Sequence, residues 1–140
     1  MLRAVLDTSV IVASLRSRTG ASNILLRRVV ARQVRPLVTT ALLYEYEAVL
    51  KRPEHQLVHG LSADAIDHFL NAFAAAAEGI DVNYRWRPQL SDPDDELVLE
   101  AAINGRADIL VTHNIRDFIS ATSRFRLRTI TPGELIKELA

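Results

Sequence analysis

Residues 2–9 read LRAVLDTS, a short β-rich run that ends directly on Asp7. Residues 109–114 read ILVTHN and repeat the arrangement, because an apolar run again stops at polar side chains. Runs of this kind alternate along the chain with longer helical patterns, which is typical of a parallel sheet covered by helices. We therefore expect an α/β fold, a three-layer α/β/α sandwich around a central parallel sheet of about five strands.

Capping residues and prolines indicate where several of the expected helices begin. Ser62 is expected to cap a helix with an apolar stripe, and Asp92 and Thr131 are each followed by proline at the first helical position. The expected strands cover residues 2–6, 36–39, 79–82, 109–112 and 127–130. The expected helices cover residues 10–16, 22–33, 40–52, 63–77, 93–104, 116–120 and 132–139.

Length and composition favour one domain over residues 1–140. With 140 residues and 49% hydrophobic side chains, the chain can bury one core and is short for two domains. Cysteine is absent, which excludes a disulfide scaffold, a thiol nucleophile and a zinc site with cysteine ligands. The first residues show no cleavage signature and no apolar stretch of about 18 residues, so we expect a cytoplasmic protein without a membrane span.

Charge is unevenly distributed although the formal net charge is zero. Residues 1–35 contain seven Arg and one acid, a balance of +6, and the rest of the chain is correspondingly −6. Arginine suits bidentate contacts to phosphate, so Arg27, Arg28 and Arg32 are candidate RNA-binding residues. A compositional preference for Arg explains the pattern equally well.

Carboxylates stand where a parallel sheet binds its ligands, just beyond the ends of strands. Asp7 follows the first expected strand, and Asp117 comes shortly after the fourth. Each position also has a structural interpretation: Asp7 as a helix cap, and Asp94 and Asp95 as partners of a helix dipole. On the helix after the second strand, Glu45 and Glu47 are two residues apart, and periodicity leaves open which one faces a site.

Four segments together carry a resemblance to a known family. In order, LDTSV, LLYEYEAVLKRP, DPDDELVLEAA and ADILVTHNIRDF resemble the PIN-domain family over nearly the whole chain. Each motif alone is weak, but four in the right order are specific. The branch most similar is the VapC-like toxin component of bacterial type II toxin–antitoxin pairs.

The resemblance implies an acidic quartet at Asp7, Glu45, Asp95 and Asp117, which would be both catalytic and metal-binding. Glu45 matches because the family's acid directly precedes an aromatic residue. Asp95 matches because it stands seven residues before an alanine at 102. Supporting polar positions fall on Ser9, Thr112 and Asn114. Many relatives carry Asp where this chain has Asn114, which leaves open whether one metal ion or two are bound.

The function that the resemblance implies is metal-dependent hydrolysis of RNA by a ribonuclease toxin. Carboxylates prefer hard cations, so the implied cofactor is Mg²⁺ or Mn²⁺, one or two ions, which activate water and neutralise charge at the phosphate. The implied partners are an RNA substrate, a small cognate antitoxin and a second copy of the chain in a homodimer.

Two other functions compete with this one. A PIN fold that binds RNA or protein without cutting is the first. A phosphatase or phosphoacceptor of the haloacid-dehalogenase or receiver type would also place Asp7 after the first strand. The dehalogenase-like pattern needs a second Asp where Ser9 stands, and both classes need a placed lysine, whereas Lys51 and Lys137 follow no expected strand.

Two further features have alternative interpretations. His55 and His59 are four residues apart and suit one face of a helix, but the glutamate of an HExxH zinc motif is missing. Trp86 lies between Arg85 and Arg87, which suits either stacking on an unpaired base or anchoring a loop.

Overall fold

The computed structural model describes residues 1–85, 87 and 89–140, and within them five parallel strands form one sheet in the order β3-β2-β1-β4-β5. This is the α/β arrangement that the alternating sequence pattern predicts. The strands are β1 (Leu2–Leu6), β2 (Val34–Val38), β3 (Glu78–Gly79), β4 (Ile109–Val111) and β5 (Arg128–Ile130).

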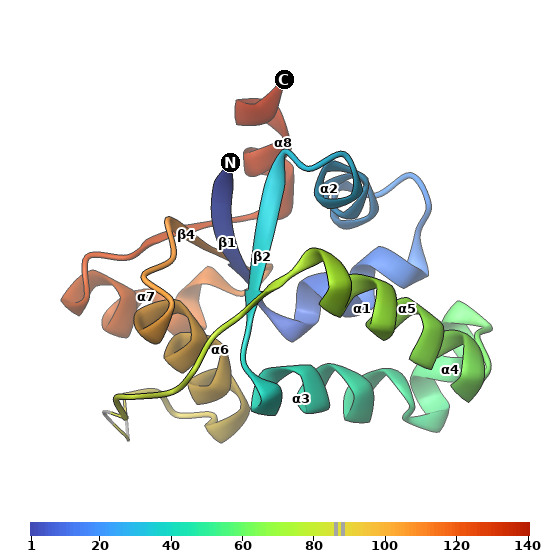
Figure 1. Ribbon diagram of the computed structural model, residues 1–140, viewed down its shortest axis with the longest axis horizontal. Coiled ribbons are helices and arrows are strands. Elements are labelled where there is room, and N and C mark those ends of the chain that lie inside the picture. The colour runs from blue at the N-terminus through green and yellow to red at the C-terminus, as the bar shows by residue number, and fades with distance from the viewer. Residues whose placement is uncertain (86, 88) are drawn as a thin grey trace.

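Helices cover the sheet on both sides. In Figure 1, α6 and α7 lie on one side of the strands, α1, α2 and α5 lie on the other, and α3 runs across the lower end of β2. The helices of the described residues are α1 (Thr8–Arg16), α2 (Ala21–Val30), α3 (Thr40–Leu50), α4 (Pro53–His59), α5 (Ala63–Ala76), α6 (Pro93–Asn104), α7 (Ile115–Arg124) and α8 (Pro132–Leu139).

Strand β1 forms the centre of the core. Ala4, Val5 and Leu6 are completely buried, because neighbouring strands pair with β1 along both edges and helices cover both of its faces. A continuous apolar run is typical of a strand in such a position, whereas a half-exposed strand alternates apolar and polar residues.

The strand order creates the place where a ligand can bind. The chain builds outward from β1 to β3 and then crosses back to β4 on the other side of β1. Ligands of open parallel sheets bind at such a reversal, beyond the carboxyl ends of the strands. Leu6 pairs with Val111 in the register of β1 and β4, and the N–H of Asp7 donates to the carbonyl of Val111 at 2.9 Å. The residues after these two strands therefore lie side by side.

Some helix ends differ from those that we expected. Helix α2 stops at Val30 and not at residue 33, because Arg32 adopts a left-handed backbone (φ 61°) that usually requires glycine. Helix α4 was not expected; it begins with Pro53 in its first turn and ends at His59, before Gly60, whose backbone is left-handed (φ 71°). Helix α7 extends to Arg124, beyond the expected end at residue 120.

The strand ends differ by smaller amounts. Strand β2 begins at Val34, two residues before the expected start, because Val34 pairs with Leu2. Strand β3 is limited to Glu78–Gly79, which pair with the last two residues of β2. In the part of the chain that the structure describes, no helix combines the length and the apolar character needed to cross a membrane. Trp86, considered above for base stacking, lies outside the described residues.

Candidate active site

Asp7 is held at the carboxyl end of β1 by two hydroxyl groups. Ser9 Oγ and Thr112 Oγ1 each donate to Asp7 Oδ2 at 2.7 Å, and only 5% of Asp7 is exposed. Asp7 is also the N-cap residue of α1, but its side chain makes no capping hydrogen bond. Its carboxylate is thus directed toward the end of β4, and the simple capping interpretation of Asp7 is wrong.

The hydroxyl of Thr112 has a defined direction. Thr112 is completely buried, and its Oγ1 accepts from the backbone N–H of Asn114 at 2.9 Å while it donates to Asp7. Asn114 is the N-cap residue of α7, yet its exposed side chain makes no capping bond. Of the three supporting positions predicted from the sequence, Ser9 and Thr112 therefore bond Asp7 directly, and Asn114 is connected to it through Thr112.

Asp95 lies in the negative field of its neighbours at the first turn of α6. Burial, followed by the charges of Asp7, Asp92, Asp117 and Asp94, raises the pKa of Asp95 to about 7. Asp117, in the first turn of α7, is exposed. Two other predicted acids, Asp7 and Asp117, from two separate segments of the chain, therefore both act electrostatically on Asp95.

Glu45 lies at the margin of this group. Burial raises its pKa, and the charges of Asp94 and Asp92 raise it further, against the opposing effect of Arg52. Asp7 and Asp117 are not among these causes, so Glu45 adjoins the start of α6 more closely than it adjoins the other two acids.

Tyr46 and Glu47, which follow Glu45 on α3, each contact a partner of their own. Tyr46 is fully buried and its hydroxyl donates to the carbonyl of Leu6, the residue before Asp7, so it fixes α3 beneath the end of β1. Glu47 pairs at 3.3 Å with Lys51, the residue that follows the end of α3. In the family motif Tyr46 is only the aromatic residue that follows Glu45, and its contact with Leu6 was not predicted from the sequence.

A pocket of about 320 Å³ lies over Asp95 and Asp117, and we call it the acidic pocket. It is bounded by α6, α7 and the segment that precedes α6. Arg116 is the basic residue among those that line it. The full lining, all from the described residues, is Gln89, Leu90, Ser91, Asp92, Asp95, Arg116, Asp117 and Ser120.

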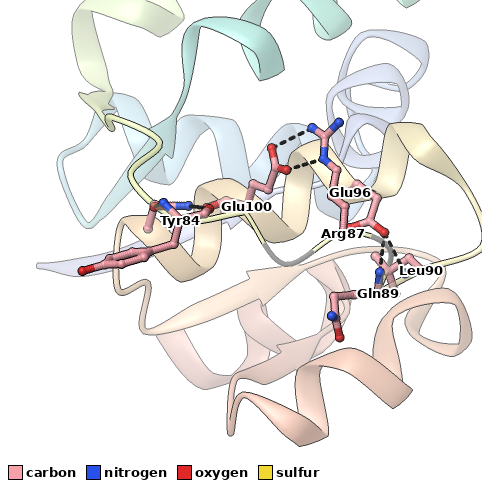
Figure 2. A network of polar contacts seen from close by, with 7 residues as sticks. Tyr84, Arg87, Gln89, Leu90, Glu96 and Glu100 are labelled. Carbon is pink, nitrogen blue, oxygen red and sulfur yellow. Dashed lines mark hydrogen bonds and ion pairs between the residues drawn. The ribbon is translucent and has the colours of Figure 1, made fainter.

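Two buried acids of α6 anchor the segment that precedes this helix. Glu96 and Glu100 are 4% and 6% exposed. Figure 2 shows the Glu96 carboxylate accepting from the backbone N–H groups of Gln89 and Leu90, at 2.6 and 2.9 Å, and Glu100 paired with Arg87. Sequence reasoning missed both residues, although acids one helical turn apart on the core face of α6 were a visible signal.

The donor set of this site fits a divalent cation that prefers oxygen. Burial and the charges of neighbouring carboxylates raise the pKa of Asp95, and a bound cation would relieve the repulsion between these carboxylates. Among the described residues, no three carboxylate or imidazole side chains are grouped closely enough to enclose one ion. The fit is therefore to an ion such as Mg²⁺, which takes one or two carboxylates and keeps several waters.

The histidine pair on α4 does not form a metal site. The ring of His59 contacts the carbonyl of Leu50 at 3.0 Å and accepts from the N–H of Leu61 at 2.9 Å. The ring of His55 contacts Arg16 at 3.2 Å. The two imidazoles thus have different partners, and the zinc interpretation of their spacing is wrong.

The three arginines predicted to bind RNA lie on or just after α2. Arg27 donates to the carbonyl of Arg18 at 3.0 Å, and Arg28 donates to Gln33 at 2.8 Å. Arg32 lines a hollow with Met1, the first residue before β1, so it lies at the amino edge of the sheet, opposite Asp7. The structure does not bring these arginines together with the acidic pocket, and their role in RNA binding stays a prediction.

Comparison with known proteins identifies the family. The PIN domain family matches residues 3–116, so the chain belongs to the PIN-domain family. Members of this family are typically nucleases, and the match does not favour the phosphatase or phosphoacceptor alternative. A search of curated proteins finds no significant match.

A solved structure supports the fold. A chain in the crystal structure of VapBC2 from Rickettsia felis, bound to a DNA fragment from their promoter, is similar with a TM-score of 0.60. The similarity covers 93% of this chain and 98% of that chain at 19% sequence identity. At this identity, the comparison establishes the shared fold.

Proposed function

We propose that this protein is an endoribonuclease that uses Mg²⁺ or Mn²⁺ to hydrolyse phosphodiester bonds of RNA. The observation that carries the proposal is the crowding of Asp7, Asp95 and Asp117 at the strand-order reversal, where the pKa of Asp95 is raised to about 7. Crowded carboxylates in an accessible pocket are typical of functional sites, since a structural site would pair them with cations. Membership of the PIN-domain family supports the same conclusion.

Each residue of the site has a role in this proposal. A bound divalent cation supplies Lewis acidity toward the phosphate and toward water. Asp7, Asp95 and Asp117 would hold it, one or two of them directly and the rest through waters that the ion keeps. Ser9 and Thr112 keep the Asp7 carboxylate in one orientation. Glu45, whose pKa is raised, is suited to accept a proton from water, because a general base works best when its pKa approaches the working pH.

We further propose that the protein is the toxin of a toxin–antitoxin pair, inhibited by a small cognate antitoxin and active as a homodimer. The motif resemblance supports this role, as does the shared fold with a chain of a VapBC2 complex.

A short neighbouring reading frame for a DNA-binding domain with a tail is expected. Its product should copurify with this chain and suppress cleavage, and light scattering should give twice the monomer mass of 15.6 kDa.

Cleavage of single-stranded RNA by purified protein tests the proposed reaction. We expect cleavage with Mg²⁺ or Mn²⁺, none with EDTA, and products with 5′-phosphate and 3′-hydroxyl ends, since water is the nucleophile. Glu45→Gln should lose activity, and the matched variant Glu47→Gln should keep it because Glu47 pairs with Lys51.

Three results would contradict the reaction in different ways. Cleavage that persists in EDTA would overturn the metal mechanism. Products with cyclic 2′,3′-phosphate ends would implicate the ribose hydroxyl as the nucleophile. RNA binding without cleavage by the folded, metal-loaded protein would favour the non-catalytic alternative.

A further inference from the structure

A second pocket, of about 440 Å³, adjoins Asp7 on the side of α1 and α4. Its floor is apolar and is formed by Val12, Ala13 and Val49, and its rim carries Arg16, His55 and His113. We call these six residues the basic pocket. Ser9 and Asn114, two of the supporting residues around Asp7, also line it, and none of the described residues in its lining is acidic.

The rim of the basic pocket offers several hydrogen-bond donors. Arg16 Nη2 lies 3.2 Å from His55 Nδ1. A guanidinium can only donate, so His55 Nδ1 is the acceptor and the neutral ring carries its proton on Nε2. That N–H and the remaining guanidinium N–H groups of the exposed Arg16 are left to bind an anion.

Ser9 connects the basic pocket to the candidate active site. Its Oγ donates to Asp7 at 2.7 Å and accepts from the backbone N–H of His113 at 3.4 Å. The basic pocket therefore begins one hydrogen bond away from the Asp7 carboxylate. A ligand with a repeated anionic group, such as a nucleic acid strand, can reach both places at once.

The acidic pocket and the basic pocket differ in how they would interact with the phosphates of RNA. The acidic pocket repels a phosphate when no cation is present, and the whole chain, with zero net charge, offers no general attraction to RNA. The basic pocket supplies the missing attraction beside the site. Its apolar floor suits the face of an unpaired base, and its rim suits the negative oxygens of a phosphate.

We propose that the basic pocket binds the nucleotide next to the scissile phosphate of single-stranded RNA. The base packs on Val12, Ala13 and Val49, and the phosphate accepts hydrogen bonds from Arg16 and His55. This inference rests on the proposed ribonuclease function and names the part of the molecule that engages the substrate strand outside the acidic pocket.

The test compares Arg16→Gln with the matched variant Arg18→Gln, in which an exposed arginine outside the basic pocket loses the same charge. In steady-state cleavage of a single-stranded RNA oligonucleotide with Mg²⁺, Arg16→Gln should raise KM about tenfold, the effect of one charged hydrogen bond, with a smaller change in kcat. Arg16→Lys should fall between wild type and Arg16→Gln. Arg18→Gln should leave KM within about twofold, because single exposed charges contribute little.

Direct binding makes the inference independent of cleavage. The same oligonucleotide, labelled with a fluorophore, is titrated with Asp95→Asn protein in Mg²⁺ with and without the Arg16→Gln change, and thermal melting confirms that each variant is folded. Loss of one phosphate contact should lower the slope of log affinity against log salt by about 0.7. His55→Ala should weaken binding in the same direction.

The outcomes separate this inference from the proposed function. Unchanged KM and RNA affinity in Arg16→Gln would overturn the basic pocket as a substrate site and leave a cleaving wild type as a nuclease. An equal loss in Arg18→Gln would also overturn it, because general charge would then explain the effect. If wild type fails to cleave but Arg16→Gln still weakens RNA binding, the basic pocket stands and the nuclease proposal fails.

Discussion

Acidic side chains at the amino edge and at the carboxyl edge of the sheet have opposite electrostatic surroundings. At the amino edge, Arg3 pairs with Glu78 at 2.8 Å, and its backbone N–H donates to Asp108 at 2.8 Å. The hydrogen bond from Arg3 holds the pKa of Glu78 below its usual range. At the carboxyl edge, burial and four neighbouring carboxylates raise the pKa of Asp95 to about 7.

The difference separates acids that are paired with cations within the fold from acids whose neighbours are mainly other acids. Acids that lie beside cations are stabilised in the folded chain without any help from outside. Acids that lie beside other acids destabilise the folded chain until a cation or a proton arrives, and such an arrangement is typical of a site. Substitutions, added metal and pH should therefore affect the two edges differently.

Replacing Asp95 should have the largest effect on activity. Asp95→Asn keeps the shape of the side chain and removes one charge from the crowded group. Cleavage should therefore fall by at least about 100-fold, which is the upper end of the loss of activity caused by removing a residue that supports a metal ligand. The metal-free variant should be at least as stable as wild type in urea unfolding. The control is Asp94→Asn in the same helical turn, which should cost about 0.3–1 kcal/mol through the helix dipole and leave cleavage intact. Wild-type cleavage by folded Asp95→Asn would refute the site assignment.

Adding a divalent cation should stabilise the wild-type protein strongly. An ion that binds only the folded state raises the free energy of unfolding by about 2.7 kcal/mol at 100 times its dissociation constant. Melting temperature measured against Mg²⁺ concentration should therefore rise for wild type and hardly at all for Asp95→Asn. Glu78→Gln should respond as wild type does, because Glu78 lies at the other edge. An equal response of all three proteins would place the ion elsewhere.

The two edges should respond to pH with opposite signs. The pKa of Asp95 is raised from 3.8 to about 7, so the folded chain holds a proton that the unfolded chain has released between these values. Without metal, this group's contribution to stability is full below about pH 4 and is lost as pH rises through 7. The pKa of Glu78 is lowered, so its contribution is present above the usual glutamate range and is lost as pH falls below it.

Urea unfolding between pH 5 and pH 8 isolates the carboxyl edge, because Glu78 stays ionised throughout that range. Metal-free wild type should lose stability relative to Asp95→Asn as pH rises. Partial exposure of Asp95 reduces the size of the loss through solvent screening. Parallel curves for the two proteins would show that Asp95 does not titrate in this range.

Replacing the acid at the amino edge should have the smallest effect. The ion pair of Glu78 with Arg3 is about one-third exposed on each side chain, so Glu78→Gln should cost roughly 0.2–1 kcal/mol of folding stability. Cleavage should be unchanged, since the pair is remote from Asp7. A loss of cleavage as large as that of Asp95→Asn would remove the distinction between the two edges.

Local signals explain how much of the fold could be predicted. Strand β1 and helices α6 and α8 have the expected bounds, because an apolar run, an N-cap residue and a following proline act over a few residues. The end of α2 could not be predicted from such local signals. Arg32 takes the left-handed conformation there, and an arginine carries none of the signal that a glycine would.

For the site, the sequence by itself determined which residue types stand just after β1 and β4 and their order along the chain, including Asp7 and Asn114. Only the tertiary structure decided which of these side chains meet. Strand order and register bring Thr112 to Asp7. Lys51 forms an ion pair with Glu47, the acid two residues after Glu45. Helix α4 brings His55 to Arg16, and both line the basic pocket together with Ser9. The physical reason is range: propensity and capping act between near neighbours in the chain, whereas a site needs side chains from distant segments, whose meeting depends on how the whole core packs.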